Sequence, residues 1–313
     1  MKNWSVKMTE DNKQNVTAER FNPKLFEYDK HTEYKWQVFK KVTIGIVTFN
    51  RVNLTQQLIE SLIKYTHLPY NLIIVDNAST DETIPYLRSL AMNYDHIRLI
   101  ENSKNKGLGR AHMQIRDELD EGLFVFFDND IEILTNYWLM HLQKAYYAYM
   151  LANGDLNVAI GIPLVNMGEY GFRFAKNRKI LTIATKDNSL PRSSYAAASK
   201  DCRNDKLILD EEVVMAETEY LVGGAFSCVA STFKSIPYED YYPSLIGGTD
   251  GFCTAALIKQ GQSLLYVENG PIARHNDWPY SDEKIVQYEA SINQRAVTDW
   301  NYFKWKIRKV MSR

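Results

Sequence analysis

The feature that most constrains this chain is an alternation of buried-strand and helical patterns between residues 41 and 162. Residues 41–50 contain the run Val-Thr-Ile-Gly-Ile-Val-Thr-Phe, which is typical of a strand covered on both faces. After Asn53, a favourable N-cap residue, leucines recur at the spacing of a helix. The alternation then repeats. The other expected strands are 72–75, 97–100, 123–127 and 158–162, and the other expected helices are 81–92, 108–119 and 136–151.

Strands that alternate with helices predict right-handed crossovers and a mainly parallel sheet, and hence an α/β fold. Residues 1–40 lack sustained periodicity and are expected to be an extension on the main domain. The rhythm is lost after Pro163, and 172–185 reads as a hairpin. Regular structure is expected to return at 220–226, followed by a helix from about Asp250, closed by Gly261, and a strand at 264–267.

Composition excludes several classes of protein. The 37 basic and 38 acidic residues give a net charge of -1, so we expect no nucleic-acid partner. Three cysteines without C-x-x-C spacing give neither a disulfide framework nor a zinc signature, which fits a reducing compartment. No run approaches the ~18 apolar residues of a membrane span. We therefore expect a cytoplasmic protein.

Polar residues follow each of the first four expected strands, where the ligands of open parallel sheets bind. They are Thr48, Phe49, Asn50 and Arg51 after the first, Asp76 after the second, Asn105, Lys106, Gly107 and Arg110 after the third, and Asp128, Asn129 and Asp130 after the fourth. The first turn has no G-x-G-x-x-G, and the chain has no P-loop motif. A dinucleotide-dependent dehydrogenase and a P-loop hydrolase are therefore disfavoured.

Two carboxylates separated by one residue, Asp128 and Asp130, suit a hard divalent cation that also binds diphosphate oxygens. A solvated acidic turn or a helix N-cap is the alternative. Asp76 could accept hydrogen bonds from a base or ribose, or it could cap a turn. His275 follows the last strand and is either a third metal ligand or a structural histidine.

Basic residues at the third turn suit a diphosphate. Lys106 and Arg110 flank a glycine-bearing turn at a helix start, where backbone N–H groups are also available. A solvated helix face is the alternative for both side chains.

Four segments in this order resemble glycosyltransferase family 2. They are Val-Thr-Phe-Asn-Arg at 47–51, Val-Asp-Asn-Ala-Ser-Thr-Asp at 75–81, Asn-Lys-Gly-Leu-Gly-Arg-Ala at 105–111 and Asp-Asn-Asp at 128–130. Val-Gly-Gly-Ala-Phe at 222–226 and Gly-Thr-Asp at 248–250 extend the resemblance. It implies a GT-A fold, a Rossmann-like mainly parallel sheet flanked by helices with a smaller mixed region on the acceptor side. Residues 41–162 would bind the nucleotide sugar, and 163–278 would form the acceptor-side and catalytic half.

The resemblance also implies roles for the candidate residues. Thr48, Asn50 and Asp76 would line the nucleoside site, with Asn105 and Arg110 beside the nucleotide. Further implied roles are those of Asp128 near ribose or metal, Asp130 and His275 on Mn²⁺ or Mg²⁺, and Asp250 as the base that takes the acceptor's proton. The expected activity is inverting, metal-dependent transfer from a nucleotide-diphosphate donor, with UDP as the expected nucleotide, to a hydroxyl of a glycan or glycolipid.

Three departures from the family pattern put acceptor recognition in doubt: Thr249 stands where Glu is usual, Phe252 where an acid is common, and Ala256 where Arg is frequent. A non-catalytic partner subunit that binds nucleotide or glycan is therefore the alternative, and a sugar nucleotidyltransferase is a weaker one. Glu239 and Asp240 form a competing acid pair. Residues 279–313 are expected to form a helical, basic-aromatic extension, of which 300–313 would either contact the inner membrane face peripherally or dock as a terminal helix.

Overall fold

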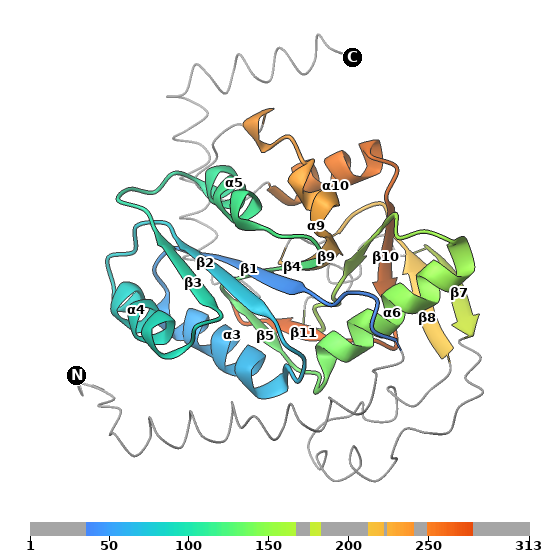
Figure 1. Ribbon diagram of the computed structural model, residues 1–313, viewed down its shortest axis with the longest axis horizontal. Helices are drawn as coiled ribbons and strands as arrows, with labels where there is room; N and C mark the ends of the chain where they lie inside the picture. Colours follow the sequence, from blue (N-terminus) through green and yellow to red (C-terminus); the bar gives the residue numbers. More distant parts are fainter. Residues whose placement is uncertain (1–35, 167–175, 183–211, 222–223, 241–248, 278–313) are drawn as a thin grey trace.

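The computed structural model describes residues 36–166, 176–182, 212–221, 224–240 and 249–277. The described strands form a nine-stranded sheet in the order β3-β2-β1-β4-β9-β6-β10-β8-β7, beside a two-stranded sheet of β11 and β5. Helices cover both faces of the large sheet (Figure 1). The expected α/β class with a large, mainly parallel sheet is confirmed.

The first half of the domain is the parallel part of the sheet. Its strands are β1 (Val42–Thr48), β2 (Asn71–Asp76), β3 (Ile97–Glu101) and β4 (Leu123–Asp128), and β1 pairs in parallel with both β2 and β4. The connecting helices are α3 (Val52–Tyr65), α4 (Thr83–Asn93) and α5 (Leu108–Glu118). Between residues 41 and 162, each strand or helix for which the sequence predicted both a first and a last residue begins and ends within two residues of that prediction.

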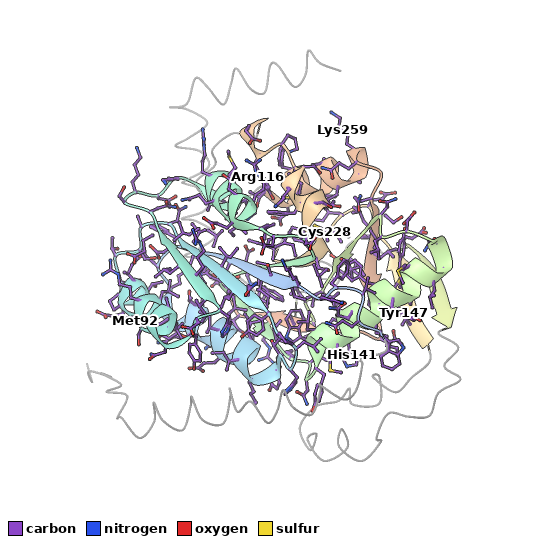
Figure 2. All side chains as sticks on the ribbon, viewed as in Figure 1. Met92, Arg116, His141, Tyr147, Cys228 and Lys259 are labelled. Atoms are coloured by element: carbon purple, nitrogen blue, oxygen red, sulfur yellow. The ribbon has the colours of Figure 1, made fainter. Side chains whose placement is uncertain are left out.

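Strand β4 shows why the sheet is apolar on both faces. Leu123, Val125 and Phe127 pack into a core with α3, α4 and α6 (Trp138–Asn153), whereas Phe124 and Phe126 pack into the other core. That second core is shared with α5, α9 (Ala230–Lys234) and α10 (Thr249–Lys259). Side chains of a strand alternate between its two faces, so a continuous apolar run supplies two cores. Figure 2 shows the side chains filling the space on both faces.

The second half of the domain is mixed. After β5 (Ile131–Ile133) and α6, strands β6 (Val158–Gly161) and β10 (Ser263–Val267) pair in parallel, and β9 (Ala225–Val229) lies antiparallel between β4 and β6. The edge is formed by β8 (Glu212–Glu217) and β7 (Lys176–Thr182), which are antiparallel. A 3-10 turn, η2 (Tyr238–Asp240), precedes α10, and β11 (Ala273–His275) ends the described chain.

Two local expectations are corrected. Helix α3 begins at Val52, not behind Asn53, because the Asp81 carboxylate accepts a hydrogen bond from the Val52 N–H at 3.2 Å and takes the N-cap function from a distant turn. The described part of the hairpin expected at 172–185 is strand β7, whose partner is β8. A strand edge pairs with the nearest free edge in space, which sequence proximity does not fix.

The two chain ends fall largely outside the described residues. Residues 1–35 of the expected N-terminal extension and all of 279–313 are not described. The last residues of the extension dock on α6, because the Gln143 side chain accepts hydrogen bonds from the N–H groups of Val38 and Phe39, both at 3.1 Å. A closing glycine after α10 is confirmed, since Gly261 has φ +76. None of the helices in the described ranges is long and apolar enough to span a membrane.

Candidate active site

The carboxyl ends of β2, β1 and β4 bring the expected site residues to one edge of the sheet. Thr48 is paired in register with Asp76 on one side of β1, and Val47 with Asp128 on the other. Neighbouring strands lie about 4.8 Å apart, so the backbones of the two aspartates are about 10 Å apart across β1. The turns after β1, β2 and β4, three of the four that were expected to meet, therefore lie at one edge of the sheet.

The turn after β1 is held to the turn after β2. Asn50 and Arg51 have left-handed backbones, with φ of 56° and 69°. The Asn50 N–H donates to Ser79 Oγ at 2.7 Å, and the Thr80 N–H donates to Asn50 Oδ1 at 2.7 Å. This conformation is costly for a residue such as Arg51 and is tolerated by asparagine, and the two bonds hold Asn50 in the turn.

Asp76 is fully buried at the base of this junction. One carboxylate oxygen accepts the Ser79 N–H at 2.9 Å, and the other accepts the Ser79 hydroxyl. In the structure the Asp76 carboxylate holds the turn after β2, and its contact with a base remains a prediction. Phe49, in contrast, leaves 44% of its side chain exposed at the end of β1.

Asn77 fixes the third turn, which leads into α5. Its Nδ2 donates to Asn105 Oδ1 at 2.8 Å, and its Oδ1 accepts the Lys106 N–H at 2.9 Å. Gly107 has φ 82, which favours glycine, and α5 starts directly after it without a side-chain cap or an acid in the first turn. The positive end of the helix dipole is left uncompensated there, and the exposed side chains of Lys106 and Arg110 add two charges.

Asn129 is turned into the fold. Its Nδ2 donates to Thr48 Oγ1 at 3.3 Å and to Thr55 Oγ1 at 3.2 Å, and the two threonine hydroxyls are 3.0 Å apart. Thr48 and Asn129 are both buried. Their side chains therefore join β1, α3 and the turn after β4, and a direct contact of either with a nucleotide stays a prediction.

Asp130 and His275 are brought together by the two-stranded sheet. Ile131 is paired with His275, and the Asn276 N–H donates to the Asp130 carbonyl at 2.7 Å. His275 Nε2 lies 3.6 Å from Asp130 Oδ1, and both side chains are buried. The side-chain amide of Asn166 brackets the His275 backbone, donating to its carbonyl at 2.7 Å and accepting its N–H at 2.9 Å. His275 is thus positioned from both sides.

Negative charge accumulates at this edge. Burial raises the pKa of Asp128 well above its usual range, and the nearby carboxylates of Asp130 and Asp250 raise it further, while Arg51 opposes the shift. Asp250 lies in the first turn of α10, near enough to act on Asp128. Asp130 and Asp250 therefore both lie close enough to Asp128 for their charges to act on it.

The fit of a divalent cation can be judged from the donor atoms. Among the residues that the structure describes, no group of three or more His, Cys, Asp or Glu side chains is arranged to hold a metal ion. Asp130 Oδ1 is nevertheless buried without a hydrogen-bond partner among these residues, next to His275. Carboxylate oxygens are ligands that Mg²⁺ and Mn²⁺ prefer, so the Asp130 carboxylate, with Asp128 near it, fits such an ion in chemistry, and the His275 imidazole would be an additional ligand beside them.

The competing acid Glu239 is tied to another partner. Its carboxylate lies 2.7 Å from Arg116 Nη2, and that hydrogen bond lowers the pKa of Glu239. Asp250, not Glu239, is the acid whose charge acts on Asp128.

Sequence reasoning missed several residues of this network. Ser79 and Asp81 lie inside the quoted 75–81 motif, so a signal existed, and Asp277 stands two positions after His275. The Asp277 carboxylate contacts the Arg51 guanidinium, whose Nη2 also donates to Asp130 Oδ2 at 2.7 Å. The positioning of His275 by Asn166 has no sequence signal.

Comparisons with known proteins identify the family of this chain. The model of "Glycosyl transferase family 2" matches residues 43–199, just over half of the 313 residues. A teichoic acid poly(glycerol phosphate) polymerase of Staphylococcus epidermidis is 29% identical over 105 residues, which are 33% of this chain and 15% of the polymerase. TagX of Staphylococcus aureus (strain MSSA476) is 27% identical over 183 residues, 55% of this chain and 49% of TagX.

A solved structure of GalNAc-T7, determined with UDP, GalNAc and Mn²⁺, has the same fold. Its TM-score is 0.51 at 15% identity, and the alignment covers 81% of this chain and 48% of that one. The chain thus spans about half the length of TagX and of this neighbour, and a smaller part of the polymerase.

Proposed function

This chain belongs to glycosyl transferase family 2, and on that premise we propose that it moves a sugar from a nucleotide-diphosphate donor to a hydroxyl acceptor. UDP is the expected nucleotide. The observation that carries the proposal is the gathering of Asp128, Asp130, His275 and Asp250 where the carboxyl ends of β1 and β4 meet the two-stranded sheet. The metal-dependent, inverting transfer proposed here uses this set: oxygen ligands for a cation and a separate carboxylate base.

The donor would lie across the turns after β1, β2 and β3. The exposed ring of Phe49 offers an aromatic face to a base, and the uncapped start of α5 offers backbone N–H groups to a diphosphate. Lys106 and Arg110 supply positive charge at the same place. Asn105 and Gly107 shape this turn, since the Gly107 N–H donates to Asn105 Oδ1 at 2.9 Å.

Mn²⁺ or Mg²⁺ would be held by Asp130 and His275, with Asp128 as a further ligand. Such an ion would stabilise the charge that develops on the departing nucleoside diphosphate. The role of the chain is to keep these ligands in place: the bond from Asn276 fixes the Asp130 carbonyl, and the Asn166 side chain fixes the His275 backbone.

Asp250 would act as the base. Its carboxylate takes the proton of the acceptor hydroxyl as the hydroxyl oxygen forms a bond to the anomeric carbon. The bond between that carbon and the diphosphate oxygen breaks, and the diphosphate leaves with the electron pair. A single attack opposite the leaving group inverts the anomeric centre. Asp250 lies in the first turn of α10, close enough to Asp128 for its charge to act there.

For the acceptor, we propose a hydroxyl of a cell-surface glycan or glycolipid. Support comes from the Staphylococcus epidermidis relative, which is named for teichoic acid polymerisation. Peripheral membrane contact through residues 300–313 remains part of the proposal and lies outside the described residues.

A nucleotide screen combined with two variants tests the proposal. Thermal shift should detect stabilisation by UDP together with Mn²⁺, and wild-type protein should consume a UDP-sugar. Asp250→Asn should keep nucleotide binding but lose transfer by about 10²- to 10⁴-fold. Glu239→Gln is the matched control, because it neutralises an exposed acid that is paired with Arg116, and its rate should equal that of wild type.

The outcomes separate the alternatives. Full transfer by Asp250→Asn would remove Asp250 as the base. Nucleotide binding without turnover on any acceptor panel would instead favour the non-catalytic partner subunit.

A further inference from the structure

Arg51 forms a bridge between two carboxylates at the candidate metal site. Its Nη2 donates to Asp130 Oδ2 at 2.7 Å and also contacts Asp277 Oδ2. That nitrogen carries two hydrogens, one for each carboxylate. The side chain of Asp130 is 8% exposed, that of Asp277 22% and that of Arg51 34%, so the bridge is partly shielded from water.

The backbone holds Arg51 toward this bridge. Arg51 has φ 69 and ψ 44, a left-handed conformation, and its carbonyl accepts the Leu54 N–H at 3.0 Å in the first turn of α3. Asn50, also left-handed, is fixed by Ser79 and Thr80. Strain of this kind persists only when the surroundings impose it, and it concentrates at functional sites.

The two oxygens of Asp130 are treated differently. Oδ2 is neutralised by Arg51, whereas Oδ1 is buried without a hydrogen-bond partner among the described residues and faces His275 Nε2 at 3.6 Å. A buried carboxylate needs a compensating charge, and the Arg51 guanidinium provides it for Asp130.

We propose that Arg51 is the counter-cation of Asp130 in the metal-free enzyme and competes with the divalent cation for this carboxylate. Asp277 keeps the guanidinium paired when Asp130 turns to the metal. The inference rests on the proposed function, because it takes Asp130 as a metal ligand. When no donor is bound, this competition weakens metal binding by the free energy of the Arg51–Asp130 pair, because that pair must break before Asp130 binds the metal.

The test is Mn²⁺ binding alone, measured by titration calorimetry and by the free Mn²⁺ signal in electron paramagnetic resonance. Arg51→Met should lower the Mn²⁺ dissociation constant by about tenfold or more, since each 1.4 kcal/mol of lost competition is a factor of ten. Arg51→Gln should act in the same direction, and it serves if the first variant folds poorly by circular dichroism.

Asp277→Asn should have the opposite effect and weaken Mn²⁺ binding, because the guanidinium then depends on Asp130 alone. In the Arg51→Met background the effect of Asp277→Asn should largely vanish, which a double-mutant cycle measures. Arg274→Met is the matched control: it removes an arginine charge from the same two-stranded sheet, where Arg274 pairs with Glu132 at 3.4 Å and not with Asp130.

The inference would be overturned if neither Arg51→Met nor Arg51→Gln bound Mn²⁺ more tightly than wild type. It would also be overturned if Arg274→Met gained as much Mn²⁺ affinity, or if no variant bound Mn²⁺. Failure of the inference alone would leave Mn²⁺-dependent sugar transfer by wild type intact. Failure of the proposed function would appear as no transfer by wild type, while the Arg51 variants still gained Mn²⁺ affinity.

Discussion

Two buried histidines should make this domain sensitive to acid. His112 on α5 is 1% exposed and His141 on α6 is 4% exposed. Burial lowers the pKa of His112 to about 3, and burial together with the charge of Lys144 lowers the pKa of His141 to about 3. Figure 2 labels His141 on α6, the helix that covers one face of the sheet. In the unfolded chain both would titrate near 6.5, the ordinary pKa of a histidine side chain.

The sign of the pH effect follows from proton binding. Above pH 6.5 both rings are neutral whether the chain is folded or not, so their contribution to stability is fully present. As the pH falls from 6.5 toward 3, the unfolded chain takes up protons that the folded chain refuses, and the free energy of unfolding decreases. The loss is about 1.4 kcal/mol per pH unit for each histidine. At pH 4.5 it is about 2.7 kcal/mol for one ring and about 5 kcal/mol for both, comparable to the whole stability of a marginal domain.

Urea unfolding followed by tryptophan fluorescence at pH 7.5, 6.5, 5.5 and 4.5 measures this loss. His112→Gln and His141→Gln should each flatten the pH dependence between 6 and 4.5 by about 1.4 kcal/mol per unit, whatever they cost at pH 7.5. His112→Gln retains a polar group near the Tyr238 hydroxyl, which His112 Nδ1 now meets at 3.0 Å. If either variant kept the wild-type slope, its histidine would titrate alike in both states, and the reasoning would be wrong.

Two further changes test the packing and the turns. Gly161→Ala should reduce the free energy of unfolding by about 1–3 kcal/mol in urea, because the new Cβ would lie 2.4 Å from a ring carbon of buried Tyr266. Gly251→Ala in α10 is the control and should be neutral or stabilising, because there is open space at its Cβ. Equal effects of the two substitutions would contradict this prediction. Asn77→Ala should lower the free energy of unfolding by about 1–3 kcal/mol, because it leaves the hydrogen-bond partners of Asn77 unpaired. It should also weaken the thermal shift given by UDP with Mn²⁺, since Asn77 holds the turn before α5. An unchanged shift would show that nucleotide binding does not depend on Asn77.

The order of strands and helices could be predicted because each is a local pattern. The apolar run before Asp128 fills two cores and therefore reads as a buried strand without any knowledge of its neighbours. The polar residues after β1, β2 and β4 could be predicted to meet, because parallel strands align their carboxyl ends. The pairing of β7 with β8 carried no such signal, because the two strands are far apart in the sequence.

Roles of individual side chains were less predictable than their location. Thr48 and Asn129 stand in the expected turns, yet their polar atoms are used to join elements of the fold. The same kind of residue in the same turn can face a ligand or the interior, and the direction depends on what lies opposite. For Asn129, that is Thr55 on α3, which no local pattern connects to it.

The amino-acid sequence by itself determined the α/β alternation and the edge of the sheet where chemistry is expected, because hydrophobic period and turn residues act over a few neighbouring positions. Only the tertiary structure decided that Asp81 caps α3, that Asn166 holds His275 and that Arg51 joins Asp130 to Asp277. These contacts join residues 29 to 226 positions apart. They depend on distances and directions in space, which exist only once the sheet has assembled.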